Sequence, residues 1–333
     1  MSLRRGAGGT HSRPVLRHAG WVVSGTLLVA VGAGSGLAFT KYPELKAYIP
    51  MYGRTEAVAF HALGRNTMRT LTQAMAGREA ELAHDAVWRR MERAGRLVRT
   101  MEDGFQLWET PHGSFWNPPG MRATWLYYAV AEQEQNVYGS AAMAVRAGDI
   151  VLDCGANLGA FTRRALNAGA GLVVAIEPAP NTFEALRKTF AREITESRVI
   201  LVDKGVWDRE GTAKFSIFPE STLMNRVDDA AGSNSVTVSL TTIDTTIERL
   251  GLQRVDFIKM DIEGAEQRAL AGAEKTLARW RPRLAIATEH SASIIENSRR
   301  IIDLLTAKGY KVDCARCGIS KKYTIVPYVL HFY

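Results

Sequence analysis

The second half of the chain alternates short apolar segments with helical ones, and this alternation constrains the fold more than any other feature. Segments of 10–15 residues with helical patterns separate most of the apolar runs. Parallel strands need such crossovers, so the pattern predicts a mostly parallel sheet with helices on both faces. Ligands of these sheets lie beyond the carboxyl ends of the strands. The expected strands cover 149–155, 172–178, 199–207, 212–218, 235–244, 255–264, 283–290, 310–313 and 323–333.

The composition fits a globular protein with a large core. Of the 333 residues, 46% are hydrophobic and 23% are charged. These values exclude a largely disordered or fibrous chain. Three cysteines are too few for a protein built around disulfide bonds.

An uncharged segment near the N-terminus predicts a membrane helix. Residues 19–40 form a run of 22 residues without a charge, which as a helix would span roughly 33 Å. An arginine-rich stretch precedes it, as in a signal anchor. A cleaved signal peptide and a soluble helix or leader are the alternatives. Gly32 and Gly36 form a GxxxG pattern that could pair two such helices in a homodimer.

The net charge of +8 is concentrated at this end of the chain. Residues 1–41 hold five basic groups and no acid, which leaves a net charge of +3 on the remainder. We therefore interpret the basic excess as membrane addressing and expect no nucleic-acid partner.

Changes in composition suggest the domain boundaries. A helical region rich in Ala, Leu, Glu and Arg follows the expected span and ends at a stretch rich in Pro, Gly and aromatic residues. We interpret that stretch as a linker. The expected units are a basic segment (1–18), a transmembrane helix (19–40), a helical region (41–107), a linker (108–120) and a catalytic domain (121–333).

A glycine-rich turn connects the first predicted strand to a helix. It contains Asp153, Gly155, Asn157 and Gly159. The glycines permit a tight turn close to a ligand, and Asn tolerates left-handed backbone angles. Glu177 ends the next predicted strand, where an acid can bind both hydroxyls of a ribose. This arrangement is typical of a nucleotide-type cofactor site.

Two cofactors compete for that site. Gly155, Asn157 and Ala160 loosely fit a dinucleotide motif, so a nicotinamide oxidoreductase is one alternative. A carboxylate at Asp153 would face a pyrophosphate unfavourably but suits the sulfonium and amino group of S-adenosylmethionine. The residues therefore favour S-adenosylmethionine.

Further charged residues are expected near the reacting atoms. Alternation places Lys259 and Asp261 on one face of an apolar strand, where each needs a partner. Asp261 and Glu263 then fall at the carboxyl end of that strand, and we assign substrate or catalytic roles to Lys259, Asp261 and Glu263. An ion-paired cap on the following helix is the alternative.

His290 follows the next strand and is a candidate general base. Transfer of a methyl group from S-adenosylmethionine to a hydroxyl would require removal of the hydroxyl proton, which suits an imidazole. Asp261 and Glu263 are competing candidates. The ligand spacing does not indicate a metal site, so none is predicted.

The C-x-x-C sequence at Cys314 and Cys317 is the remaining motif. Zinc would need two more ligands, and no second C-x-x-C is present. We interpret the pair as incidental, unpaired cysteines in a turn before the final strand.

The sequence resembles the FkbM-type family of methyltransferases. The resemblance rests on DCGANLG, AIEP and VDFIKMDIEGAE (255–266), and EQEQNVYG (132–139) is similar to the family's lead-in. It implies a class I methyltransferase fold, with a seven-stranded sheet that contains one antiparallel strand. It further implies S-adenosylmethionine as cofactor and O-methylation of sugars or related hydroxyls.

The resulting expectation is a membrane-anchored O-methyltransferase that acts on a sugar, glycan or lipid-linked acceptor. A non-catalytic membrane scaffold that retains the fold is the principal alternative. Because S-adenosylmethionine is made in the cytosol and the cysteines are expected to be unpaired, we expect a single-pass protein with a cytosolic catalytic domain.

Overall fold

A computed structural model describes most of the chain after residue 51. The described residues are 52–66, 68, 70–139, 143–227, 234–290, 293–319 and 325–333. The basic segment, the expected span at 19–40 and the Gly32/Gly36 pair lie outside them. Within the described part, no helix combines the length and apolarity that crossing a membrane requires.

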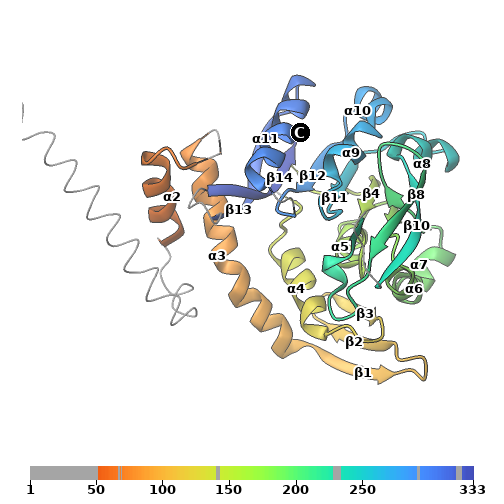
Figure 1. Cartoon of the computed structure of the whole chain (residues 1–333). Helices are drawn as coiled ribbons and strands as arrows, with labels where there is room; N and C mark the ends of the chain where they lie inside the picture. Colours follow the sequence, from red (N-terminus) through yellow and green to blue (C-terminus); the bar gives the residue numbers. More distant parts are fainter. Residues whose placement is uncertain are drawn as a thin grey trace, which may run out of the picture.

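A seven-stranded sheet forms the centre of the catalytic domain (Figure 1). β14 runs antiparallel to both of its neighbours, and the other pairings in the sheet are parallel. This is the class I methyltransferase arrangement that the resemblance implies. In spatial order the strands are β13 (Val312–Ile319), β14 (Ile325–Phe332), β12 (Arg283–Ala287), β11 (Phe257–Met260), β4 (Ile150–Cys154), β5 (Leu172–Ile176) and β6 (Val199–Val202).

Helices cover both faces of this sheet, and each face has its own core. The predicted alternation along β11 is confirmed, because Phe257 belongs to one core and Ile258 and Met260 belong to the other. One core includes side chains of α5 (Ala160–Asn167) and α6 (Pro180–Thr189), which α7 (Ala191–Thr195) follows. The other includes side chains of α8 (Ile243–Arg249), α9 (Glu266–Ala271), α10 (Glu274–Trp280) and α11 (Ile294–Ala307).

The region before the first strand of the central sheet differs from its prediction. Helices α2 (Tyr52–Ala62) and α3 (Leu71–Ala94) lie in the predicted helical region, but α3 ends at Gly95. A three-stranded antiparallel sheet and helix α4 follow. These elements are β1 (Arg96–Thr100), β2 (Gln106–Thr110), β3 (Gly113–Asn117) and α4 (Ala123–Glu134).

The predicted linker at 108–120 is therefore wrong. Most of it forms the hairpin of β2 and β3, whose Phe115 and Trp116 are buried against α4. The Pro and Gly residues around the hairpin suggested a packed linker between two domains. The structure instead places them at the turns, as with Gly113, whose φ is 124°.

A second sheet lies beside the carboxyl ends of the central strands. Its order is β7 (Gly205–Val206), β10 (Ser235–Thr241), β8 (Gly211–Ser216) and β9 (Arg226–Val227). The predicted strands at 212–218 and 235–244 are present here, but they pair antiparallel and outside the main sheet. Among the described residues, only the short 3-10 helix Thr222–Met224 and strand β9 lie between them in the sequence, and parallel pairing would require a longer crossover.

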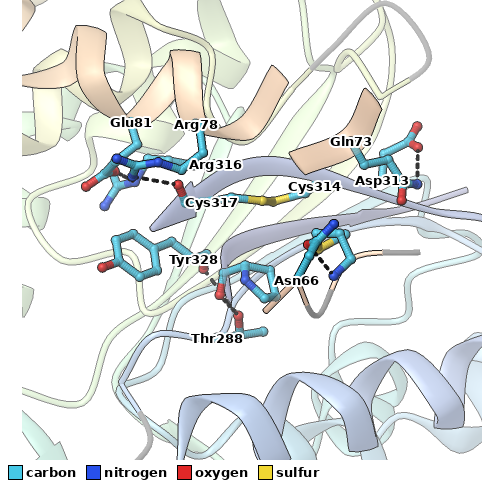
Figure 2. The surroundings of a disulfide bond; sticks show 12 residues. Asn66, Gln73, Arg78, Glu81, Thr288, Asp313, Cys314, Arg316, Cys317 and Tyr328 are labelled. Atoms are coloured by element: carbon cyan, nitrogen blue, oxygen red, sulfur yellow. Dashed lines mark hydrogen bonds and ion pairs between the residues drawn. A yellow bond between two sulfur atoms is a disulfide. The ribbon is translucent and has the colours of Figure 1, made fainter. Parts of the chain in front are cut away.

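The two C-terminal cysteines are not in a turn. Cys314 and Cys317 both lie in β13 and form a disulfide (Figure 2). In a regular strand, residues three apart point to opposite faces. The pairing of β13 with β14 shifts register on either side of Arg316, and this irregularity brings the two sulfur atoms together. The prediction of unpaired cysteines is thus wrong.

Candidate active site

The turn between β4 and α5 has the backbone conformation that the sequence indicated. Gly155 has a φ of 74°, and a β-carbon there would overlap the carbonyl oxygen of Asp261. Asn157 has a φ of 49°, in the left-handed region. The backbone N–H groups of Gly155 and Ala156 both donate to the carbonyl of Ile176, each at 3.0 Å. Glycine is thus needed at position 155 for both conformation and space.

Glu177 follows β5 and lines a cavity beside this turn. Its carboxylate accepts hydrogen bonds from the N–H groups of Asn157 and Ala179, each at 3.0 Å. Burial raises the pKa of Glu177 to about 7. A carboxylate has more acceptor capacity than two N–H groups use, so Glu177 can also accept hydrogen bonds from a ligand's hydroxyl groups.

Asp153 and Gly159 do not line this cavity. Asp153 is fully buried, accepts a hydrogen bond from the Thr162 hydroxyl at 2.7 Å and lies 3.3 Å from Lys259 Nζ. Gly159 caps α5 in a left-handed conformation, packed against Phe190. Neither residue forms part of the cavity wall in this structure, and their contact with a cofactor stays a prediction.

Lys259 is enclosed rather than exposed to the cavity. Its ammonium group donates to the carbonyl of Gly155 at 2.7 Å and lies 4.0 Å from Asp261 Oδ2. Burial alone would lower the pKa of Lys259, but Asp153 and Asp261 outweigh it and raise that pKa. Lys259 therefore ties the glycine turn to the end of β11, and the structure places no part of it at the cavity wall.

Asp261, Glu263 and His290 come together at the carboxyl ends of β11 and β12. His290 Nε2 lies 3.1 Å from Asp261 Oδ1, and His290 Nδ1 lies 3.1 Å from Glu263 Oε2. The two carboxylic residues also line the cavity that Glu177 borders. Glu263 has a φ of 56°, an uncommon conformation for a non-glycine residue that is often found at functional sites.

Electrostatics favour a protonated His290 in this arrangement. Burial would lower the pKa of the imidazole, but its hydrogen bonds to Asp261 and Glu263 outweigh burial and raise that pKa well above its usual value. Burial likewise opposes ionisation of Asp261, but Lys259 and His290 together lower the pKa of its carboxyl. Because both ring nitrogens face carboxylates, His290 must lose a proton and exchange a partner before it can act as a base.

The same three side chains have the spacing of metal ligands. One ligand atom from each lies within 4.8 Å of the others. The imidazole ring, however, stands between the carboxylates and turns a different nitrogen toward each. A metal ion would have to break one of these contacts, so the observed arrangement is that of an ion-paired histidine.

The structure places residues at the site that the sequence patterns did not predict. The hydroxyl of Tyr138 donates to Asp261 Oδ2 at 2.9 Å. A segment between β8 and β9 closes over the turn, where the Thr222 hydroxyl donates to Asn157 Oδ1 at 3.0 Å. Tyr138 does lie within the lead-in segment 132–139, which offered a clue. The segment around Thr222 has no recognisable motif.

Comparisons with known proteins identify the family. Residues 153–312 match the model of the methyltransferase FkbM domain. The 31-O-demethyl-FK506 methyltransferase FkbM of Streptomyces tacrolimicus is 29% identical over 199 residues, which cover 50% of this chain and 75% of that protein.

Two crystal structures illustrate the structural similarities. Methyltransferase FkbM from Methylobacillus flagellatus has a TM-score of 0.44 at 18% identity, covering 76% of this chain and 59% of its own. The chain thus spans less than two thirds of that protein. The O-methyltransferase of Bacillus cereus in complex with SAH has a TM-score of 0.34 at 13% identity, covering 61% of this chain and 77% of its own.

The matched family model, the curated relative and the motifs at the site agree. Residues 153–312 of the chain thus match a methyltransferase FkbM domain, the domain of the FkbM-type family of S-adenosylmethionine-dependent methyltransferases.

Proposed function

We propose that this protein transfers a methyl group from S-adenosylmethionine to a hydroxyl oxygen of a sugar, glycan or lipid-linked acceptor. One observation carries the proposal. A single cavity is bounded by Gly155, Asn157 and Glu177 at one part of its wall and by Asp261 and Glu263 at another. His290 contacts both of the latter. A cofactor-type site and the two carboxylates that contact His290 therefore border the same space.

The residues present fit the cofactor. Glycine at position 155 permits close approach of a ligand to the backbone, and Glu177 offers a carboxylate to ribose hydroxyls. We assign Gly155, Asn157 and Glu177 to cofactor binding, with Asp153 and Gly159 in supporting positions. S-adenosylmethionine, when bound, supplies a methyl group activated by a sulfonium.

His290 is the proposed general base, and Glu263 orients it. In this mechanism the acceptor hydroxyl replaces Asp261 as the partner of Nε2, while Nδ1 keeps its hydrogen bond to Glu263. His290 first releases the proton on Nε2 to water. The neutral imidazole then takes the hydroxyl proton, and the Glu263 carboxylate stabilises the imidazolium that results. General bases of this kind contribute about 10²–10⁴-fold to a rate. Asp261 and Lys259 keep the end of β11 and the glycine turn in place.

The sequence relative supports the choice of an oxygen acceptor. Its name describes methylation of 31-O-demethyl-FK506, that is, of an oxygen. We extend this chemistry, but not that substrate, to the present chain.

We also propose that residues 19–40 anchor the protein in a membrane, with Gly32 and Gly36 available for a homodimer. The catalytic domain is proposed to face the cytosol, where S-adenosylmethionine is made. The argument from unpaired cysteines no longer supports this orientation, because Cys314 and Cys317 are bonded. Protease protection in sealed vesicles tests it, since cleavage from the cytosolic side is expected and full protection would contradict it.

Calorimetry with S-adenosylmethionine, followed by transfer of a labelled methyl group to glycan and lipid extracts, tests the main proposal. We expect binding and a labelled methyl ether. Absence of binding would overturn the cofactor assignment, and a label on nitrogen or carbon would overturn O-methylation. Binding without transfer to any extract would favour the non-catalytic scaffold, and binding of a nicotinamide cofactor instead would favour an oxidoreductase.

A further inference from the structure

A buried arginine lies outside the cofactor cavity and contacts Glu289, the residue before His290. The side chain of Arg316 in β13 is only 2% exposed. Its Nη1 lies 2.7 Å from Glu132 Oε1, its Nε lies 2.9 Å from Glu81 Oε2, and its Nη2 lies 3.3 Å from Glu289 Oε1. Nη2 also donates to the Tyr128 hydroxyl at 3.0 Å. One guanidinium thus joins α3, α4 and the loop after β12.

The charges in this cluster depend on one another. Burying an ion is costly unless its partners are close and well placed. Burial raises the pKa of Glu132 and also raises the pKa of Glu289, to about 7, while Arg316 opposes both shifts. Loss of the guanidinium would leave carboxyl groups from three elements without their shared cation. Such a cluster is well suited to fix a loop in one position.

The loop that Arg316 holds leads directly into the active site. After β12 ends, the N–H of Thr288 donates to the carbonyl of Tyr328 at 2.8 Å, and its hydroxyl donates to the carbonyl of Pro327 at 2.7 Å. Glu289 then meets Arg316, and His290 follows at once. Thr288 is therefore anchored to β14 and Glu289 to β13, and His290 follows them and faces Asp261 and Glu263.

The disulfide encloses the backbone of Arg316. Cys314 and Cys317 lie on either side of it, and the register shifts of β13 occur at this residue. Helix α3 packs over the bond, with Gly77 against Cys317 and Arg78 donating to the Cys317 carbonyl at 3.2 Å (Figure 2). The bond, the bulge and the helix therefore hold the strand in a shape that directs Arg316 toward Glu289.

We propose that Arg316 is a positioning residue for methyl transfer: through Glu289 it holds His290 between Asp261 and Glu263, and the Cys314–Cys317 disulfide holds Arg316 in place. The inference rests on the proposed role of His290. Reduction by a dithiol would break the S–S bond, deliver two electrons and two protons to give two thiols, and convert the dithiol to its own disulfide. The bulged strand could then relax, and Arg316 and His290 would no longer be held in their positions.

Nitrogen-15 NMR of the His290 ring in the full-length protein tests this without an acceptor. The variants are Arg316→Lys, which keeps the charge but lacks the planar fork, and the double variant Cys314→Ser/Cys317→Ser. In the parent protein we expect a doubly protonated ring at neutral pH. In both variants we expect changed ring signals and loss of the proton at lower pH, because the carboxylate contacts weaken. The charged groups around the imidazole are Asp261, Glu263, Glu266 and Glu289, with Arg226 beyond Glu263.

Arg283→Lys is the matched control. Arg283 is the first residue of β12, the strand whose other end leads into the loop with His290. It pairs with the buried Asp149 at 2.6 Å. A general loss of stability would affect this variant as well, but its His290 signals should match the parent's. Unchanged His290 signals in Arg316→Lys, or equal changes in Arg283→Lys, would overturn the positioning role. A parent protein without the disulfide by mass spectrometry, or a double serine variant with parental signals, would overturn the role of the bond.

Activity provides a second measurement once an acceptor is known. Arg316→Lys should lower kcat by about 100-fold, since a small misplacement of a catalytic group has effects of this size. Its affinity for S-adenosylmethionine should stay within about twofold of the parent's, because Arg316 does not line the cofactor cavity. A parallel loss of cofactor affinity would contradict the inference. If the parent binds no cofactor, the proposed function fails, whereas the NMR result still reports on Arg316.

Discussion

The two sides of the active site are built in different ways. On the cofactor side, the Gly155 turn and Glu177 lie within 23 residues of chain and interact mainly through backbone N–H groups. On the acceptor side, His290 depends on side chains from residue 81 to residue 316. Local sequence specifies the first side, whereas the folded tertiary structure specifies the second.

This difference explains how each side should respond to substitution. The cofactor side, which uses backbone groups, should be sensitive to any side chain added where the turn has no room. The side around His290, which uses charged side chains, should be sensitive to the loss of a single charge. The following predictions test that distinction, beginning with the largest expected effect.

Gly155→Ala should destabilise the protein by about 3 kcal/mol, measured by urea unfolding, because the new methyl group meets the Asp261 carbonyl at a positive φ. Gly251→Ala is its control, since Gly251 has a φ of 63° but open space around it. That variant should lose about 1–2 kcal/mol from backbone strain alone. Equal losses in the two variants would mean that the close approach at Gly155 is unimportant.

His290→Gln should lower kcat by about 100-fold with a small change in affinity for S-adenosylmethionine. The amide keeps some hydrogen bonding but cannot accept the acceptor's proton. Steady-state kinetics with an identified acceptor measure the effect. Full turnover in this variant would exclude His290 as the base and leave Asp261 or Glu263 as candidates.

Glu177→Gln should weaken S-adenosylmethionine binding by about 30-fold, which corresponds to about 2 kcal/mol. The amide nitrogen cannot accept the N–H of Asn157 or of Ala179, so one of these contacts is lost together with an acceptor for ribose. Calorimetry measures the change. An unaltered affinity would place the ribose elsewhere.

Glu263→Gln should shift the acidic limb of the rate–pH profile to lower pH by about one unit. The parent's His290 has a raised pKa that depends partly on the Glu263 carboxylate. Removing that charge lowers this pKa, so the neutral, basic form of the imidazole appears at lower pH. A shift in the opposite direction would show that Glu263 does not act on His290 as proposed.

Much of the central fold could be predicted because its signals are local. The apolar runs and the glycine turn define β4, β5, β11 and β12, and the topology of the seven-stranded sheet followed from the resemblance. Segment 96–101 was misassigned because its Arg, Leu and Met residues suit a helix as well as a strand. Pairing with β2, which no local pattern indicates, makes it strand β1.

Within the site, the sequence predicted which residues are present more accurately than it predicted the contacts between them. Asp261, Glu263 and His290 were expected in one region, and the structure brings them together. Asp153 was expected at the cofactor, because a carboxylate at a strand end ordinarily faces the ligand. The buried ammonium of Lys259 draws it inward instead. Contacts between side chains 106 residues apart in sequence are set by packing, which single-sequence patterns do not encode.

The contact between Glu81 and Arg316 also determines how far the protein can be shortened. A protein beginning at residue 121 would retain the whole 153–312 region that the family model matches. It would lack α3, however, and with it one carboxylate partner of Arg316 and the cover over the disulfide. The smallest fragment able to fold with an ordered active site should therefore begin before Leu71, so the functional domain is considerably longer than the family signature within it.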